Sequence, residues 1–283
     1  MTLLDVDALG TLTAPVIVTA FDGWVNAGSA GTTAAEHLAG DSPVVGRVDP
    51  DLLFDYRAVR PTADFVDGVL TEVAYPELTL RHRSLGGRDV LILSGTEPNW
   101  NWRSLGRDLS QHAVRLGVVE YVSLGGIPWA TAHTRMTSVI LTASQPEDLP
   151  PDPHRPAGTL RVPASATSAL EKAVADQGIP CHGFWARVPQ YVGATYLPAA
   201  VALLERVSTQ LGVSVPYGSI VEDAAEQRTR LDEITAARPE VRALVEQLEA
   251  LSDEEETSGE ELAAEIERFL QGQPGADGMP GEL

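Results

Sequence analysis

The chain has 283 residues, 43% of them hydrophobic, which is enough for one large core or for a domain with an appendage. No apolar run reaches the roughly 18 residues of a membrane span, and the formal net charge of −20 excludes nucleic acid and anionic membrane surfaces as expected partners. The single cysteine, Cys181, and an acidic N-terminal stretch without the order of a secretory signal predict a cytoplasmic protein.

Strands and helices alternate in the first part of the chain. Residues 16–21 form an apolar run that predicts a buried strand, and a helix rich in small residues follows at 29–38. A second apolar run at 90–95 precedes a helix whose apolar residues recur at helical spacing over 105–116, with Gly117 just past its end. Nearly continuous apolar runs of this length are typical of a sheet that is covered on both faces.

The same alternation continues toward the middle of the chain. Two more apolar runs, at 119–125 and 138–144, predict two further strands. The proline-rich segment 145–163 is predicted to be a loop. A helix is predicted next, with Ser165 as its N-cap and Gly178 just past its end.

A longer helical pattern occupies residues 193–211. Pro198 is expected in the first turn of this helix, and Gly212 closes it. Because strands and helices alternate up to this point, the sequence predicts a three-layer α/β/α core domain over residues 1–217.

The last quarter of the chain has a different composition. Residues 218–283 hold 18 acidic and 5 basic residues, so most of the excess negative charge lies there. Two apolar stripes at helical spacing are separated by the acidic segment 253–261. We predict an acidic helical extension over 218–272 and a disordered tail over 273–283. A solvated appendage is favoured over an arm that docks on a basic partner. The two stripes are Val241, Leu244, Val245, Leu248 and Leu251, and Leu262, Ile266, Phe269 and Leu270.

All five tryptophans fall in four stretches that share a texture of glycines, polar residues and aromatics. Three of these stretches, DGWVNAGSAG, TEPNWNWR and GIPWATAHTR, follow predicted strands, and the fourth is CHGFWARVPQY. In parallel α/β sheets, the loops at the carboxyl ends of the strands form the crevice where ligands bind. We therefore expect one shared ligand- or partner-binding surface. Packing in the core or in a subunit interface is the alternative for the indoles of Trp24, Trp100, Trp102, Trp129 and Trp185.

Polar residues in these loops are the other candidates for that surface. The turn that contains Gly23, Gly28 and Gly31 is interpreted as structural, with an anion site at the helix start as the alternative. Two of the polar residues could equally be helix caps or ligand contacts, and two others are expected to form a salt bridge rather than a catalytic pair. The first two are Asp22 and Asn26, the pair is Glu97 and Arg103, and His133 and Arg135 complete the set.

Catalytic machinery is not evident from motifs. The sequence has no G-x-S-x-G elbow, no phosphate-binding loop and no metal-ligand spacing among its six histidines, so no metal or cofactor is predicted. Lys172 is the only lysine and is expected to point into solvent from a helix, which disfavours Schiff-base and most ATP-phosphate chemistry. No catalytic residues are assigned. The sequence favours a protein without catalytic activity, and an enzyme remains the alternative.

The quoted stretches, in the forms FDGWVNAGSAG, GTEPNWNWR, SLGGIPWATAHTR and GFWARVPQYVGATYLPAA, resemble the signatures of the proteasome assembly chaperone 2 family in its bacterial, actinobacterial-type form. The resemblance implies an α/β/α domain similar to the nucleoside phosphorylase fold, a homo-oligomer with a trimer as one option, and proteasome subunits as partners. The chain ends in Gly281-Glu282-Leu283, which departs from the hydrophobic–tyrosine–any tripeptide of many such chaperones.

Two functions follow from this reading. The first is an oligomeric, chaperone-like protein that binds proteins through the tryptophan loops, the acidic extension or both. The alternative is a small-molecule-binding protein or enzyme that uses the crevice at the carboxyl edge of the sheet.

Overall fold

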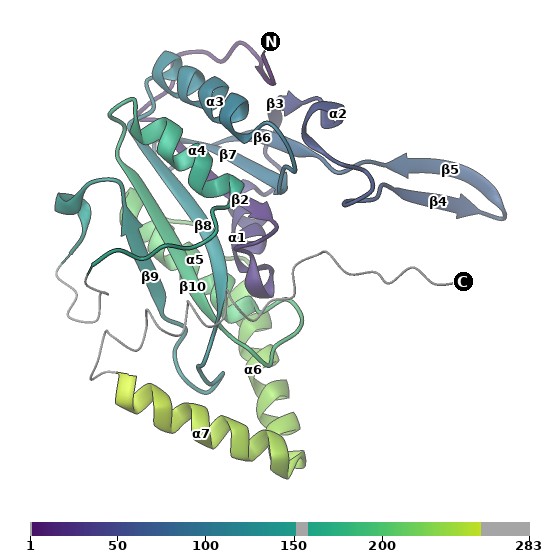
Figure 1. The fold of residues 1–283 in the computed structure, drawn as a ribbon, viewed down its shortest axis with the longest axis vertical. Coiled ribbons are helices and arrows are strands. Elements are labelled where there is room, and N and C mark those ends of the chain that lie inside the picture. The colour runs from purple at the N-terminus through teal and green to yellow at the C-terminus, as the bar shows by residue number, and fades with distance from the viewer. Residues whose placement is uncertain (1, 151–157, 256–283) are drawn as a thin grey trace.

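A computed structural model describes residues 2–150 and 158–255 of the chain. Its centre is an eight-stranded mixed sheet with the strand order β1-β3-β6-β7-β2-β8-β10-β9 (Figure 1). These strands are β1 (Leu4–Val6), β2 (Val16–Asp22), β3 (Val44–Val48), β6 (Leu78–Leu85), β7 (Arg88–Thr96), β8 (Glu120–Trp129), β9 (Val139–Ala143) and β10 (Cys181–Pro189).

The four central strands β7, β2, β8 and β10 run parallel to one another, and the remaining pairs are antiparallel. All four strands that the apolar runs predict are confirmed as β2, β7, β8 and β9. In β2 every residue from Val16 to Phe21 is buried, because helices cover both faces of the sheet at its centre.

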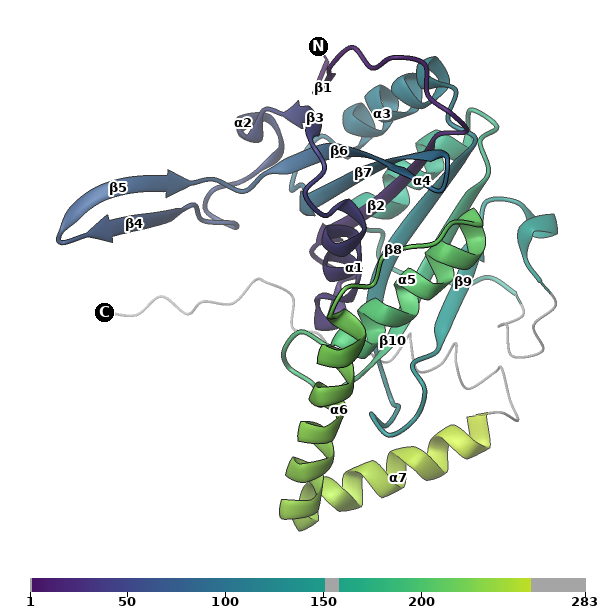
Figure 2. The ribbon, with the colours of Figure 1, turned by 180° about the vertical axis from the view of Figure 1, so that it is seen from behind.

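Helices form the two outer layers, which confirms the three-layer α/β/α arrangement. One face is covered by α1 (Ala30–Ala39) and α5 (Leu197–Leu211), and the other by α3 (Trp102–Leu116) and α4 (Ala166–Ala175) (Figures 1 and 2). Side chains of β2 point alternately to the two faces of the sheet. Val18 belongs to the core under α1 and α5, and Ile17 belongs to the core under α3 and α4.

The helix ends follow the predicted caps with one correction. The Ser165 hydroxyl accepts a hydrogen bond from the Ser168 N–H at 3.2 Å, and Gly117 and Gly212 are left-handed at φ 68° and 62°. The helix predicted over 193–211 begins later than expected, at Leu197 and not at residue 193. Pro198 then lies in the first turn, where its missing N–H costs no helical hydrogen bond.

Residues 44–85 contain a set of elements that the apolar patterns do not predict. Besides β3 and β6, these are the short helix α2 (Pro50–Leu53) and a hairpin formed by β4 (Thr62–Val66) and β5 (Val69–Ala74). The hairpin projects away from the three layers as an arm, and every residue of its two strands is exposed (Figures 1 and 2). Two 3-10 turns, η1 (Ala27–Ser29) and η2 (Pro146–Asp148), complete the described elements, and η2 lies in the predicted loop.

The C-terminal part that the structure describes consists of α6 (Ile220–Ala237) and α7 (Pro239–Glu255). Helix α7 runs on into the first residues of the acidic segment 253–261 that separates the two apolar stripes. The second apolar stripe and the tail over 273–283 lie outside the described residues, and the domain boundaries at 217 and 272 remain predictions. Within the described residues, no helix combines the length and the apolar character that crossing a membrane requires.

Candidate functional site

The parallel strands β2, β7, β8 and β10 place their following loops at one edge of the sheet, which we call the carboxyl edge. It comprises residues 23–29, 97–101, 130–138 and 190–196. Trp24 and Trp100 lie in these loops, as predicted. Trp102 instead opens α3, and Trp129 and Trp185 lie within β8 and β10, because those two strands extend beyond their apolar cores.

The tryptophans in the strands and at the helix start are packed. Trp129 is only 1% exposed, and the Arg187 guanidinium lies 4.3 Å from the centre of its ring. The Trp185 ring lies over Gly125, where an added Cβ would come within 2.7 Å of it. Its Nε1 donates to the Thr142 hydroxyl at 2.9 Å. The Nε1 of Trp102 donates to a backbone carbonyl at 2.5 Å, so these three side chains stabilise the fold.

Trp24 and Trp100 are different, because 41% and 55% of their surface is exposed. Backbone hydrogen bonds hold both residues in place. The Trp24 N–H donates to Glu97 Oε2 at 2.7 Å, and the Trp100 N–H donates to the Leu53 carbonyl at 3.0 Å. These two indoles are therefore presented to solvent from loops whose backbone is anchored.

Asn26 caps α1, so of the two roles left open for this residue, helix cap or ligand contact, the structure shows the helix cap. Its Oδ1 accepts from the N–H groups of Gly31 at 3.0 Å and Thr32 at 3.2 Å, and its Nδ2 donates to Asp22 Oδ1 at 3.2 Å. The first amides of α1 therefore already have an acceptor, which argues against an anion site at this helix start. Gly28 supplies the turn at φ 59°.

Glu97 makes no ion pair with Arg103 in the described part of the chain, so the expected salt bridge is wrong. Its Oε2 accepts from the Trp24 N–H at 2.7 Å and its Oε1 accepts from the Ala166 N–H at 2.7 Å. A carboxylate at the N-terminus of α4 also interacts favourably with that helix dipole. Glu97 thus ties the loop after β2 to α4, and Arg103 is an exposed residue of α3.

His133 is fully buried and connects the carboxyl edge to α6. The Tyr191 hydroxyl accepts from the His133 backbone N–H at 2.7 Å and lies 2.5 Å from Nδ1, while Nε2 lies 3.2 Å from Asp232 Oδ1. The hydroxyl therefore donates to Nδ1, and Nε2 carries the proton that faces the carboxylate. Burial lowers the pKa of His133 below 6.5 and so favours this neutral form.

An apolar contact reinforces this connection between the edge and the C-terminal helices. Val245 and Leu248 of α7 are buried against Ala130 and Ala132, whereas Leu244 of the same predicted stripe is 41% exposed. An Arg228 nitrogen from α6 donates to the Thr134 carbonyl at 3.1 Å. Helices α6 and α7 therefore cover the carboxyl edge at β8 and β10, as Figures 1 and 2 show.

The buried cysteine and its neighbour do not form a reactive pair. Cys181 lies in the core under α3 and α4, where burial raises the pKa of its thiol to about 12. The ring of His182 faces the other layer, where its Nδ1 lies 2.9 Å from Glu120 Oε1 and this contact raises the pKa of the histidine. In the described residues, no group of three or more His, Cys, Asp and Glu side chains is placed to hold a metal ion.

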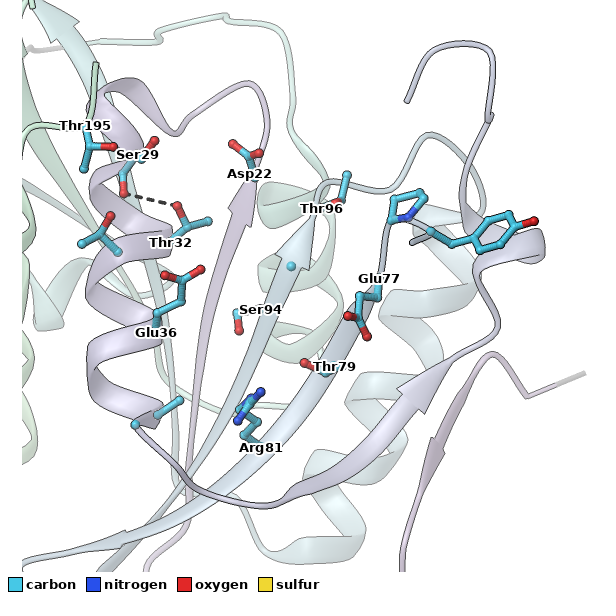
Figure 3. A pocket seen from close by; sticks show the side chains of 16 residues that line it. Asp22, Ser29, Thr32, Glu36, Glu77, Thr79, Arg81, Ser94, Thr96 and Thr195 are labelled. Atoms are coloured by element: carbon cyan, nitrogen blue, oxygen red, sulfur yellow. Dashed lines mark hydrogen bonds between the residues drawn. The ribbon is translucent and has the colours of Figure 1, made fainter. Parts of the chain in front are cut away.

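A cavity of about 630 Å³ lies beside α1 at the exposed half of the edge, and Asp22 lines it (Figure 3). Apart from Asp22, no predicted site residue reaches this cavity. It is lined by Glu36, Glu77, Arg81 and Ser94, which no motif of the sequence indicates. The alternation of leucine with polar residues over 78–81 is the one signal that could have indicated a strand with a polar face there.

The predicted site residues therefore do not share one crevice. His133, Trp129 and Trp185 support the half of the edge at β8 and β10, and Arg135 is exposed in the loop after β8. Asp22, Trp24, Asn26, Glu97 and Trp100 form the half at β2 and β7. The fold and the carboxyl edge together define a class of protein. It is an α/β/α sandwich with a mixed sheet, in which helices cover one half of the carboxyl edge and the other half exposes two indoles.

Comparison with known proteins places the chain within that class. The model of the PAC2 family matches residues 20–235, and the chain belongs to this family. A Mycobacterium tuberculosis protein of unknown function is similar at 31% identity and a TM-score of 0.82, over 95% of this chain and 92% of that one. No curated protein matches the chain significantly.

Two further solved structures are similar over almost their whole length. A PAC2 family protein from Streptomyces avermitilis has 32% identity and a TM-score of 0.72, over 82% of this chain and 99% of that one. A proteasome-assembly chaperone homologue from Mycobacterium tuberculosis has 31% identity and a TM-score of 0.73, over 81% of this chain and 99% of that one.

Proposed function

We propose that the chain is a cytoplasmic, chaperone-like protein that binds proteasome subunits through the exposed indoles of the carboxyl edge. The observation that carries this proposal is the pair Trp24 and Trp100, which are 41% and 55% exposed on loops with an anchored backbone. Exposed tryptophans on a preorganised surface are the side chains that most often dominate protein interfaces. The description of the Mycobacterium tuberculosis relative as a proteasome-assembly chaperone homologue supports the choice of partner.

The binding of purified proteasome α-subunits tests this proposal. We expect the wild-type chain to form a complex that light scattering resolves, and the double variant Trp24→Ala/Trp100→Ala to lose at least about tenfold in affinity. Val114→Ala is the matched control, because Val114 is also exposed but lies on α3 away from the edge. No complex with α-subunits, together with normal proteasome assembly in a deletion strain, would contradict the proposal.

We also propose that the protein is a homo-oligomer and that the β4–β5 arm makes the contact. The arm exposes Phe65, Val66, Val69 and Leu70, and Phe65 alone is 65% exposed. A two-stranded hairpin without a packed face is marginally stable in water, and a cluster of exposed apolar side chains marks an interaction surface. Most soluble oligomers are homo-oligomers, so we propose a second copy of the chain as the partner of this surface.

The mass in solution tests the role of the arm. We expect an oligomer, with a trimer as one option, and we expect the double variant Phe65→Asp/Leu70→Asp to be monomeric. Glu72→Gln is the control, because this residue lies on β5 and is exposed without being apolar. A wild-type chain that remains monomeric at high concentration would contradict this part of the proposal.

A further inference from the structure

The cavity lies beside α1, on the face of the sheet that carries α1 and α5. Helix α1 packs over β2, β7 and β8 and forms one wall of the cavity, while Tyr75, Pro76 and Glu77 at the base of the arm form the opposite wall. The floor consists of β6 and β7 (Figure 3). Its volume of about 630 Å³ lies within the roughly 300–1,000 Å³ that is usual for small-molecule sites.

The floor is polar because strand residues alternate between the two faces of the sheet. Leu78 and Leu80 of β6 are buried in the core under α3 and α4, so Thr79 and Arg81 point toward the cavity. Ser94 of β7 lies between them and α1 in Figure 3. The cavity is therefore a polar recess beside the apolar core under α1 and α5.

Serine and threonine hydroxyls are the most frequent polar groups in the lining. Seven serine and threonine side chains line the cavity, from β2–α1, β6, β7 and the loop before α5. A hydroxyl both donates and accepts, so this lining matches a ligand that carries several hydroxyl groups of its own. An apolar occupant is a poor match for this lining. The apolar β4–β5 arm of a second copy is therefore not expected to fill the cavity.

Carboxylates make the charge of the cavity lining negative. Asp22, Glu36 and Glu77 lie around it on three sides, and among the described residues Arg81 is the one basic residue that lines it (Figure 3). An Arg81 nitrogen already donates to the Ser42 carbonyl at 3.0 Å. Among the described residues, Glu36 and Glu77 have no hydrogen-bonding or ion-pair partner for their carboxylates. A phosphate or carboxylate ligand would be repelled, and an ammonium group would gain acceptors.

We propose that this cavity binds a small polyhydroxylated amine with the chemistry of an amino sugar. Its ammonium group lies among Asp22, Glu36 and Glu77, and its hydroxyl groups contact Ser94 and the threonines of the floor. The site is separate from the indoles proposed to bind protein, so either proposal can fail while the other holds.

Titration of the full chain with four probes tests both parts of the ligand chemistry. Glucosamine carries the amine and the hydroxyls, glucose lacks the amine, putrescine lacks the hydroxyls, and glucosamine 6-phosphate adds an anion. We expect saturable binding of glucosamine by calorimetry or ligand-observed NMR, at least about tenfold tighter than the other three. Equal binding of glucose or putrescine, equal binding of the phosphate, or no saturable binding of glucosamine would each overturn the proposal.

Variants locate the site. Glu77→Gln is expected to weaken glucosamine binding by about tenfold, because it removes one charged acceptor. Ser94→Leu fills the middle of the cavity and is expected to abolish binding while the circular dichroism spectrum stays native. Glu72→Gln on the arm removes a carboxylate that is exposed outside the cavity and should leave binding unchanged. Binding that survives Glu77→Gln and Ser94→Leu at full strength would place the ligand elsewhere and overturn the proposal.

Discussion

The two halves of the carboxyl edge are built from the same kind of loop and yet differ in what covers them. At β8 and β10, the loop after β8 is covered by α6 and α7 through His133, Val245 and Leu248. At β2 and β7, the loops present Trp24 and Trp100 to solvent beside a polar cavity. The difference shows that loops with the same texture of tryptophan, glycine and polar residues are covered by helices in one half and present two indoles to solvent in the other.

The same substitution in both halves should give the largest contrast. Trp129→Ala is expected to lower the free energy of unfolding by about 3–5 kcal/mol, because it removes a ring that is only 1% exposed. Trp100→Ala should change it by less than about 0.5 kcal/mol, because more than half of that residue is in solvent at 55% exposure. Urea unfolding measures both values. Similar losses for the two variants would remove the distinction between the halves.

The difference between the two halves could not be predicted from the sequence, whereas the main strands and helices of the fold could. The strand at 16–21 and the helix over 105–116 were predictable because apolar spacing and a glycine at the helix end are local signals. β6 and the arm were missed, because Leu78 and Leu80 alternate over a short strand and the apolar residues of the arm have no core to pack on.

The partners of the polar residues could not be predicted for a related reason. Glu97 accepts from Ala166, which is 69 positions away, and His133 faces Asp232, which is 99 positions away. No spacing rule connects residues at such distances. The nearby Arg103 was the obvious local partner for Glu97, but two backbone N–H groups occupy the carboxylate in the fold.

The cover over β8 and β10 can be tested within one helix. Leu248→Ala should cost about 2–3 kcal/mol, since the leucine is buried against the loop after β8. Leu244→Ala is the matched control and should cost less than about 1 kcal/mol, because Leu244 is 41% exposed. Hydrogen exchange should show faster exchange in α7 and in the loop at 130–138 for the first variant alone. Unchanged exchange in that loop would show that α7 does not cover it.

The covered half should also respond to acid. Burial lowers the pKa of His133, so the unfolded chain binds its proton more readily than the folded chain does, and stability falls as the pH drops below about 6.5. We expect amide exchange in α6 and α7 to quicken as the pH falls from 7 to 5. His133→Gln should flatten this dependence.

His182 provides the internal contrast to that pH dependence. Its contact with Glu120 raises the pKa of the ring, so its contribution is fully present below about pH 6.5 and is lost as the pH rises through the raised pKa. Acid should therefore loosen α6 and α7 while the contact between β10 and β8 at His182 holds. Equal acceleration of exchange in β10 and in α7 would contradict the assignment to His133.

The smallest effect is expected at the ion pair that the loop sequence suggests and the fold does not form. Arg103→Ala should change the free energy of unfolding by less than about 0.5 kcal/mol, because the side chain is exposed and makes no pair with Glu97. Glu97→Gln should cost about 1–3 kcal/mol, because it weakens two charge-assisted hydrogen bonds to backbone N–H groups. A double-mutant cycle of the two positions should therefore give a coupling energy near zero. A coupling energy of about 1 kcal/mol would show that Glu97 and Arg103 do form a salt bridge. It would also indicate that side-chain charges, rather than hydrogen bonds to the backbone, hold the open half of the edge.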